Sequence, residues 1–202
     1  MSTDLMCQVL RIPGRLSNKA ALVTGGASGF GAAIAAKFIL EGAEVVITGL
    51  SIENGQDVSN ELKCSFVQAD VTKRSDWEFV LNEVLREHGG IDIVVNNAGA
   101  TYPSKTLWKG KERDFDLCIN VNLKSLFLAT SVIVPTTIKQ NRGGCFVQVS
   151  SISAKRPGAG LTWYASSKAA VTTMRAASKS LAVEFGPSGM RFNSVSPGIG
   201  AT

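Results

Sequence analysis

The sequence contains little of what several classes of protein need. Only one residue, His88, is a histidine, which argues against a nucleophilic triad built on that side chain. His88 falls at the glycine-bounded end of a predicted helix, where we expect it to face solvent or to cap carbonyl groups. The four cysteines lie far apart, without a C-x-x-C pair. Neither a zinc cage nor a disulfide framework is therefore predicted, and we expect four reduced thiols and no metal.

Long apolar runs and dense basic runs are also missing. No segment is continuous enough to predict a signal peptide or a bilayer-spanning helix, so we expect a cytoplasmic protein with no membrane partner. The formal charge of +5 is spread along the chain without interleaved aromatics. That distribution argues against nucleic acid as a partner, although a modest positive field also suits a ligand that carries phosphates.

What is present is the pattern of a single α/β domain. Apolar residues make up 45% of 202, with 20 glycines and only 6 prolines, which is typical of a packed globular chain. Residues 1–19 are read as a leader and residues 20–202 as the domain. There, short apolar runs alternate with longer helix-period segments, which predicts a Rossmann-like, doubly wound parallel sheet between helical layers. The predicted strands are Ala21–Thr24, Glu44–Thr48, Ser65–Ala69, Ile91–Val95, Cys145–Val149 and Met190–Val195.

The clearest helix signal follows the third predicted strand. Ser75 to Glu78 reads as a capping box, and four apolar residues then recur at helical spacing. Those residues are Trp77, Val80, Leu81 and Val84. Gly42, the Gly89-Gly90 pair and the segment 186–189 are expected to end helices.

A glycine-rich turn follows the first predicted strand and opens a helix. Its sequence is Thr24-Gly25-Gly26-Ala27-Ser28-Gly29-Phe30-Gly31. Glycines allow a tight turn and a close approach of the backbone to a pyrophosphate, whose charge the free N–H groups and the helix dipole stabilise. The residues that we expect to contact a dinucleotide here are Gly25, Ser28, Gly29, Phe30 and Gly31.

Further motifs appear in a fixed order after this turn, and with its T-G-x-x-x-G-x-G spacing they resemble the short-chain dehydrogenase/reductase family. They are Asp70, Asn96-Asn97-Ala98-Gly99, Asn122, Ser151, Tyr164-x-x-x-Lys168 and the terminal Pro197-Gly198-Ile199-Gly200-Ala201-Thr202. The resemblance implies an NAD(P)-dependent oxidoreductase acting on carbonyl or secondary alcohol groups. It also implies that Asp70 contacts the adenine, that Asn97 approaches the ribose, and that Ile199 and Thr202 lie near the nicotinamide.

The Tyr164-x-x-x-Lys168 spacing places both side chains on one helical face, where a lysine cation stabilises a phenolate. Reduction of a carbonyl needs a proton donor at the oxygen, and we expect Tyr164 to be this general acid, and the base in oxidation. Lys168 is expected to bond the nicotinamide ribose as well. The resemblance assigns Ser151 to the substrate oxygen and Asn122 to a proton-relay water.

Each assignment has an alternative in the sequence. Ser150 and Ser153 compete with Ser151, which we choose by its spacing to Tyr164. Asn120 competes with Asn122, which we choose because Val121-Asn122-Leu123 matches the family pattern. Asp70 could instead cap a turn. Trp163 could touch substrate, although a packed aromatic is the expected role.

Two departures from the family leave questions open. Gly49 and Leu50 stand where a Rossmann site carries an acid for the ribose hydroxyl or an arginine for a 2′-phosphate, and from the missing acid we favour NADP(H) weakly over NAD(H). Family members continue about fifty residues further, so we read the chain as C-terminally shortened, with its sixth strand an exposed edge. The alternative function is therefore an impaired nucleotide-binding or dimerising module. We expect a homodimer or homotetramer.

Overall fold

The computed structural model describes residues 14–198, and for residues 174–182 the backbone alone. The strands form one six-stranded sheet in the order β3-β2-β1-β4-β5-β6. Every neighbouring pair is parallel, so the carboxyl ends of all six strands meet at one edge. The strand order reverses between β1 and β4, and this is the position at which open α/β sheets bind ligands.

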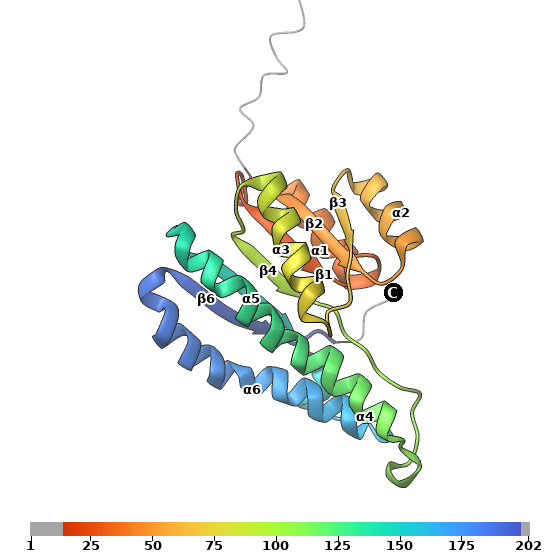
Figure 1. The fold of residues 1–202 in the computed structure, drawn as a ribbon. Coiled ribbons are helices and arrows are strands. Elements are labelled where there is room, and N and C mark those ends of the chain that lie inside the picture. The colour runs from red at the N-terminus through yellow and green to blue at the C-terminus, as the bar shows by residue number, and fades with distance from the viewer. Residues whose placement is uncertain (1–13, 199–202) are drawn as a thin grey trace, which may run out of the picture.

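Strands and helices alternate along the chain, as predicted (Figure 1). The elements are β1 (Ala20–Thr24), α1 (Gly29–Leu40), β2 (Glu44–Gly49), α2 (Ile52–Leu62), β3 (Ser65–Gln68), α3 (Arg74–His88), β4 (Ile93–Asn96), the 3₁₀ turn η2 (Leu107–Lys109), α4 (Glu112–Ile119), the π-helix η3 (Asn120–Lys124), α5 (Ser125–Gln140), β5 (Gly144–Val149), the 3₁₀ turn η4 (Ile152–Ala154), α6 (Thr162–Phe185), the 3₁₀ turn η5 (Gly186–Ser188) and β6 (Met190–Val195).

Helices cover both faces of the sheet, and a separate apolar core lies under each layer. On one face, α3 and α5 pack on a core that includes Leu22, Val46 and Phe146. On the other face, α1 packs on a core that includes Val23 and Ile47. Successive residues of the central strands β1 and β2 thus enter opposite cores, which explains why these strands read as continuous apolar runs. The predicted Rossmann-like architecture is confirmed.

All six predicted strands form, and their ends agree with the prediction to within two residues. Gly42 and Gly89 have positive φ where α1 and α3 end, as expected of helix-terminating glycines, and Gly189 has one before β6. The predicted capping box was wrong. Helix α3 begins at Arg74 with Lys73 as its N-cap, so Ser75 already lies inside the helix. The apolar stripe of α3 is nevertheless buried as predicted.

The prediction for His88 was also wrong. Its side chain is only 15% exposed, and its Nδ1 lies 2.9 Å from Oε2 of Glu44 at the start of β2. The imidazole therefore lies between the end of α3 and the start of β2, largely shielded from solvent and remote from the carboxyl edge of the sheet.

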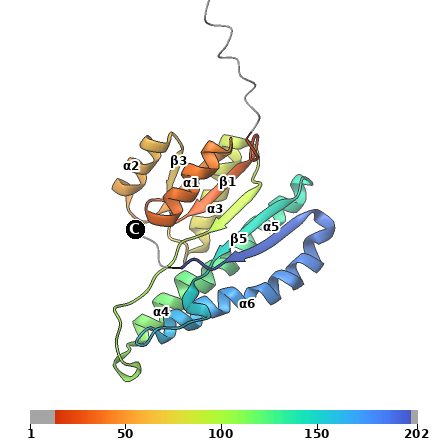
Figure 2. The ribbon, with the colours of Figure 1, turned by 180° about the vertical axis from the view of Figure 1, so that it is seen from behind.

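Strand β6 is an edge of the sheet, as expected. Figure 2 shows that α1 and α2 lie over the half of the sheet formed by β1 to β3, whereas no described helix crosses β5 and β6 on this side. Val195 of β6 is accordingly 48% exposed.

We predicted no segment long and apolar enough to span a bilayer, but one helix meets these criteria. Helices α4, η3 and α5 run on as a continuous helix of 29 residues from Glu112 to Gln140, and an 18-residue window within it has a mean hydropathy of 1.7, enough by length and composition to cross a bilayer. Half of the apolar window is buried inside the fold, where Ile133 and Ala129 pack on the sheet. The buried core helix of a soluble protein meets the same criteria of length and composition, so this helix is weak evidence for a membrane-spanning segment.

Candidate active site

The backbone of the glycine-rich turn after β1 leaves no space for a Cβ atom at Gly25 or Gly31. Gly25 has a φ of +62°, and a Cβ on Gly31 would lie 2.1 Å from the carbonyl oxygen of Gly25. Ser28 is the N-cap of α1, but its side chain does not cap the helix. The first N–H groups of α1 therefore remain available to an anion, as a pyrophosphate site requires.

Asn97, which follows β4, holds this turn in place. Its Nδ2 donates to the carbonyl oxygens of Thr24 (2.9 Å) and Gly25 (3.2 Å). In return, Oγ1 of Thr24 accepts the N–H groups of Asn97 (3.1 Å) and Ala98 (3.0 Å). The ends of β1 and β4, adjacent at the reversal of strand order, are thereby fixed to each other.

A cavity of about 300 Å³ extends from the glycine-rich turn past the ends of β2 and β3. Its lining residues are Gly25, Ala27, Ser28, Thr48, Gly49, Leu50, Ser51, Asn54, Ala69, Asp70, Val71, Ala98, Gly99, Ala100, Leu117 and Val121. Asp70 is the one charged residue among them, so within residues 14–198 this cavity has no lysine or arginine in its lining. We call it the adenosine-side cavity, because it lies where the sequence predicts the adenine contact.

Asp70 also forms the turn that its alternative interpretation predicted. Its Oδ1 accepts bonds from the N–H (2.9 Å) and the hydroxyl (2.7 Å) of Thr72. Burial raises the pKa of the Asp70 carboxyl, but the two bonds from Thr72 and the nearby Lys73 ammonium outweigh it, and the pKa is lowered. The carboxylate is therefore ionised at neutral pH. Turn formation and a ligand contact are compatible, since Asp70 also lines the cavity.

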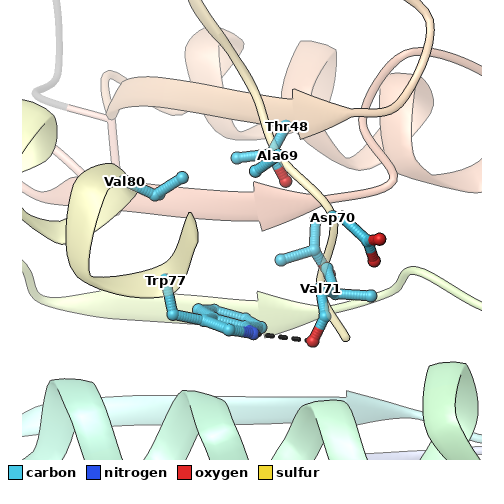
Figure 3. A pocket seen from close by; sticks show the side chains of 7 residues that line it. Thr48, Ala69, Asp70, Val71, Trp77 and Val80 are labelled. Carbon is cyan, nitrogen blue, oxygen red and sulfur yellow. Dashed lines mark hydrogen bonds between the residues drawn. The ribbon is translucent and has the colours of Figure 1, made fainter. Parts of the chain in front are cut away.

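A much smaller cavity of about 10 Å³ lies beside Asp70, between the sheet and α3. Figure 3 shows Thr48, Ala69 and Val80 around it, and the indole Nε1 of Trp77, which donates to the carbonyl oxygen of Val71 at 2.9 Å. This bond ties the segment after β3 to α3. The floor next to Asp70 is therefore packed against the core rather than open to solvent.

A second large cavity, of about 320 Å³, adjoins the turn on the side of β5 and α6. It is lined by Phe30, Asn97, Gly99, Ala100, Thr101, Val149, Ser150, Ser151, Tyr164, Lys168, Pro197 and Gly198. We call it the catalytic-side cavity. The structure thus brings together the predicted residues Phe30, Asn97, Ser151, Tyr164 and Lys168. Ile199 and Thr202 lie outside the described residues.

Lys168 is the most buried of these groups, with 4% of its surface exposed. Its Nζ donates to the carbonyl oxygen of Val149 at 2.9 Å. Burial lowers the pKa of the Lys168 ammonium to about 8, while Cys118 opposes this shift. Lysine and tyrosine side chains four residues apart share one face of α6, so both reach the catalytic-side cavity.

The three candidate serines have different surroundings. Ser150 is 4% exposed, and its hydroxyl donates to the carbonyl oxygen of Lys168 at 2.7 Å. Ser153 lines a different hollow, on the outer side of α6. Ser151 lines the catalytic-side cavity, and its Oγ accepts the N–H of Ser153 at 3.1 Å, which leaves its hydroxyl proton free to donate.

Asn122 lies in the π-helix η3 and is 2% exposed, whereas Asn120 is partly buried. The Oδ1 of Asn122 accepts the N–H of Ala100 (2.8 Å), and its Nδ2 donates to Ser167 Oγ (2.9 Å). A Cβ on Gly99 would lie 3.1 Å from Lys168 Nζ and 3.3 Å from Asn122 Oδ1. Asn122 and Lys168 thus approach the same glycine, although the structure shows no direct bond between them.

Two buried side chains of this region were missed as functional candidates. Ser167 is fully buried, and its Oγ accepts a hydrogen bond from the side-chain amide of Asn122. Tyr102 is 5% exposed, and its phenol oxygen accepts the N–H of Trp163 at 3.0 Å. No spacing in the sequence connects Tyr102 with Trp163, since 61 residues separate them. Trp163 packs edge-on against Phe115, with ring centroids 5.3 Å apart, which is the packing role expected of it.

The described residues contain no group of three or more histidine, cysteine or acidic side chains able to hold a metal ion. The catalytic-side cavity brings together a phenol, an ammonium group, hydroxyls and an amide beside the glycine-rich turn.

Comparisons with known proteins place this geometry in context. A family model described as short chain dehydrogenase matches residues 19–202. A 4-formylbenzenesulfonate dehydrogenase of Comamonas testosteroni is 42% identical over 192 residues, which are 93% of this chain and 75% of the relative. A 3-oxoacyl-(acyl-carrier-protein) reductase of Thermotoga maritima is 40% identical over 190 residues, 92% of this chain and 75% of the relative.

Solved structures agree with these sequence matches. A short chain dehydrogenase from Mycobacterium smegmatis superposes with a TM-score of 0.86 at 29% identity, covering 93% of this chain and 80% of that one. A 3-ketoacyl-(acyl-carrier-protein) reductase from Brucella melitensis, complexed with NADH, gives a TM-score of 0.85 at 30% identity, covering 91% and 76%.

Proposed function

The chain belongs to the short-chain dehydrogenase/reductase family and is an NAD(P)-binding oxidoreductase of carbonyl and alcohol groups, and we propose that Tyr164 is its general acid and base. The observation that carries this proposal is the catalytic-side cavity, which Tyr164, Lys168 and Ser151 line together beside the anion-binding turn. A nucleotide-binding module without catalysis is not favoured, because the relatives are dehydrogenases and reductases.

The cavities fit a dinucleotide. Gly25 and Gly31 leave the space that a Cβ would fill, and the first N–H groups of α1 face it, so this turn would bind the pyrophosphate. Asp70 would bind the adenine amine in the adenosine-side cavity, and Asn97 and Lys168 would contact the ribose on the nicotinamide side. Ser28, Gly29 and Phe30 complete this set. When bound, the reduced cofactor supplies the hydride.

The chain's own groups would move the proton. In reduction, Tyr164 donates its phenolic proton to the carbonyl oxygen while the hydroxyl of Ser151 donates a hydrogen bond to the same oxygen. The Lys168 ammonium stabilises the phenolate that remains, and its burial strengthens this attraction. Asn122, fixed by Ala100 and Ser167, would hold the water that returns a proton to Lys168.

Tyr164→Phe tests the assignment. We expect turnover to fall by about 10³-fold, a typical loss for a general acid, while the dissociation constant of the cofactor changes little. Turnover would be followed as NAD(P)H oxidation with a panel of aldehydes and ketones, and binding by cofactor fluorescence. Turnover of the variant within a few-fold of the wild type would refute the role of Tyr164.

For the cofactor, we propose a weak preference for NADP(H). No carboxylate stands at Gly49 or Leu50 to repel a 2′-phosphate, and the Ser51 hydroxyl and Asn54 lie in the same cavity as hydrogen-bond donors. Because no lysine or arginine lines the cavity, the preference should be small. Equal dissociation constants for NADPH and NADH in a fluorescence titration would defeat it.

Two further proposals concern the molecule as a whole. We propose a homodimer or homotetramer formed through α4, α5 and α6, since Phe115, Leu117 and Phe127 of this helical layer are 40%, 40% and 61% exposed. Light scattering after gel filtration would test it, and a monomer at micromolar concentration would contradict it. The three described cysteines are free thiols, which fits a reducing compartment such as the cytoplasm, tested by imaging a tagged chain.

A further inference from the structure

Acidic and basic residues are distributed very unevenly along the chain. Asp116 and Glu184 are consecutive acids, so the 67 residues between them carry no carboxylate side chain. The same stretch carries eight basic residues, which are Lys124, Lys139, Arg142, Lys155, Arg156, Lys168, Arg175 and Lys179. This stretch contributes β5, η4 and the start of α6, the elements that form the catalytic-side cavity. Within this stretch, Lys155, Arg156 and Lys168 belong to the segments that follow β5, at the carboxyl edge of the sheet.

Two of these cations stand directly after the catalytic serine. Lys155 and Arg156 follow η4, four and five residues beyond Ser151, and both are exposed. A 3₁₀ turn rises about 2 Å per residue, so the backbone of Lys155 lies within roughly 8 Å of that of Ser151 along the chain. Neither cation is within ion-pair distance of a carboxylate in the described part of the chain.

The segment that carries them is held by hydrogen bonds. Ser151 caps η4, and the N–H of Ile152 donates to the carbonyl oxygen of Pro197 at 2.8 Å. The N–H groups of Lys155 (2.9 Å) and Arg156 (2.8 Å) both donate to the carbonyl oxygen of Ile152. The two cations are thus presented at a fixed place beside the cavity rather than on a loose tail.

Nothing on the cofactor side explains these charges. Among the residues whose side chains the structure describes, none that lines the adenosine-side cavity is basic, and Lys168 is the one cation that lines the catalytic-side cavity. No carboxylate lines the catalytic-side cavity. An anion placed next to Ser151 and Tyr164 would therefore meet no repelling acid among the described lining residues, and Lys155 and Arg156 stand four and five residues further along the chain.

We propose that the substrate is a small carbonyl compound that carries an anionic substituent, a carboxylate, sulfonate or phosphate, which Lys155 and Arg156 recognise. The inference rests on the proposed function, since it places the carbonyl group at Ser151 and Tyr164. Because both cations are exposed, their contribution is long-range and weakened by salt. They select among substrates by charge and do not take part in proton transfer.

Matched ligands test the inference at equilibrium. Aromatic and aliphatic aldehydes and ketones would be titrated into the protein saturated with oxidised cofactor, each as a carboxylate and as its methyl ester. At low ionic strength we expect the carboxylates to bind roughly tenfold more tightly, the size of one Coulomb interaction at 6–8 Å near a surface. The preference should fall in 0.5 M salt and disappear in K155Q/R156Q.

The control is K63Q/K139Q, which removes two exposed lysines at the opposite edge of the sheet and should leave the preference intact. Equal binding within the pairs, tighter binding of the esters, no binding of any carboxylate, or an unchanged preference in K155Q/R156Q would overturn the inference. Binding requires no hydride transfer. The proposed function is judged separately by the turnover of Tyr164→Phe, so the two failures are distinguishable.

A different observation concerns the first turn of α6. The early N–H groups of a helix have no partner within it, and here the Tyr102 oxygen accepts the one from Trp163, the residue before Tyr164. Tyr102 is itself fixed, since the Nζ of Lys105 lies 5.4 Å from its ring centroid and bonds Asp114 at 2.7 Å. The segment after β4 thereby holds the start of the helix that carries the catalytic phenol.

We infer that Tyr102 is a positioning residue, which sets where Tyr164 stands relative to Lys168. This second inference also rests on the proposed role of Tyr164. Tyr102→Phe keeps the ring and removes one oxygen, so the protein should fold. We expect kcat to fall about tenfold with cofactor affinity unchanged, and the alkaline limb of the kcat profile to shift, because the distance between phenol and ammonium changes.

Ser104→Ala is the matched control. Its hydroxyl contributes a weaker bond of 3.4 Å from the same segment to the carbonyl oxygen of Ala159 and does not reach α6. An unchanged kcat and pH profile in Tyr102→Phe, or equal losses in both variants, would overturn the positioning role. If Tyr164→Phe retained turnover, the proposed function would fail whatever Tyr102→Phe did.

Discussion

Burial of the Lys168 ammonium should lower the free energy of unfolding of the protein without cofactor, and we expect this group to be retained for its role in catalysis. Lowering the pKa of this side chain from 10.5 to about 8 corresponds to about 3 kcal/mol at about 1.4 kcal/mol per pH unit. The cause is burial, and the group is 4% exposed, so little of this is screened by solvent. Replacing Lys168 by methionine removes that cost but leaves the carbonyl oxygen of Val149 without its partner, a loss of about 1–2 kcal/mol.

The difference in the free energy of unfolding between the wild type and Lys168→Met should change with pH in a defined direction. A depressed lysine pKa means that the unfolded chain binds more protons between pH 8 and 10.5, so the wild type gains stability as the pH rises through that window. The methionine variant has no such group and gains nothing from it. At pH 7 we expect Lys168→Met to be about 1–2 kcal/mol more stable than the wild type without cofactor, and near pH 10 the advantage should vanish or reverse.

Urea unfolding of both proteins at pH 7, 8.5 and 10, without cofactor, would measure the difference. Cys64 and Cys145 have no interaction with Lys168 among the causes of their pKa shifts, so their contributions are common to both proteins and cancel. Burial raises the pKa of Cys118 and the charge of Lys168 opposes this shift, so C118A would be introduced into both proteins to remove this coupling. The variant should also lose turnover, which shows that stability and activity are opposed at this residue. A variant that is less stable than the wild type by the same amount at every pH would refute the reasoning.

Three further substitutions probe the framework of the site. Gly31→Ala would place a Cβ 2.1 Å from the Gly25 carbonyl and should abolish cofactor binding in a fluorescence titration, whereas Gly89→Ala, strained only by its φ of +66°, should cost about 1 kcal/mol and bind cofactor normally. Asp92→Ala removes the acceptor of the Ala20 N–H and of Arg142, and should lower the free energy of unfolding by about 2–3 kcal/mol. Trp77→Phe should cost about 1 kcal/mol through its bond to the Val71 carbonyl; an unchanged urea midpoint in either variant would contradict these contacts.

The central strands β1, β2 and β4 could be predicted because they are buried on both faces and therefore read as continuous apolar runs. The edge strand β6 alternates buried and exposed residues instead, and glycines marked the helix ends before and after the strands. The start of α3 was placed wrongly for a local reason. Ser75 and Glu78 fit the capping-box pattern, but the carboxylate of Asp76 in the first turn accepts the N–H of Asp70, and the helix begins one residue before Ser75. A hydrogen bond between residues six apart thus accompanies a helix start that the capping-box pattern did not predict.

His88 shows the same limit for a side chain. Its position at a helix end was predictable, but its partner Glu44 lies 44 residues earlier in the chain, at the start of a strand that pairs elsewhere. Motif spacing could locate Tyr164 and Lys168, because a helix repeats every few residues. It could not find Tyr102, whose contact with the same helix depends on the path of a segment with little regular structure.

Asn122 is predicted over Asn120 by its resemblance to the family pattern and because Asn120 is expected to face elsewhere on the helix, and the structure shows how the two residues differ in burial. In a regular α-helix, residues two apart point to opposite sides, so one of the two asparagines must face the core. The π-helix from Asn120 to Lys124 widens the turn at this point, and a bulge of this kind is frequent at functional sites. The Asn122 amide there bonds both Ala100 and Ser167, which belong to the segment after β4 and to α6. If residues 120–124 formed a regular α-helix, the Asn122 side chain would point in a different direction and would lose its bond to Ala100 or to Ser167. We therefore expect that a variant in which η3 becomes a regular α-helix no longer places the proposed water next to Lys168.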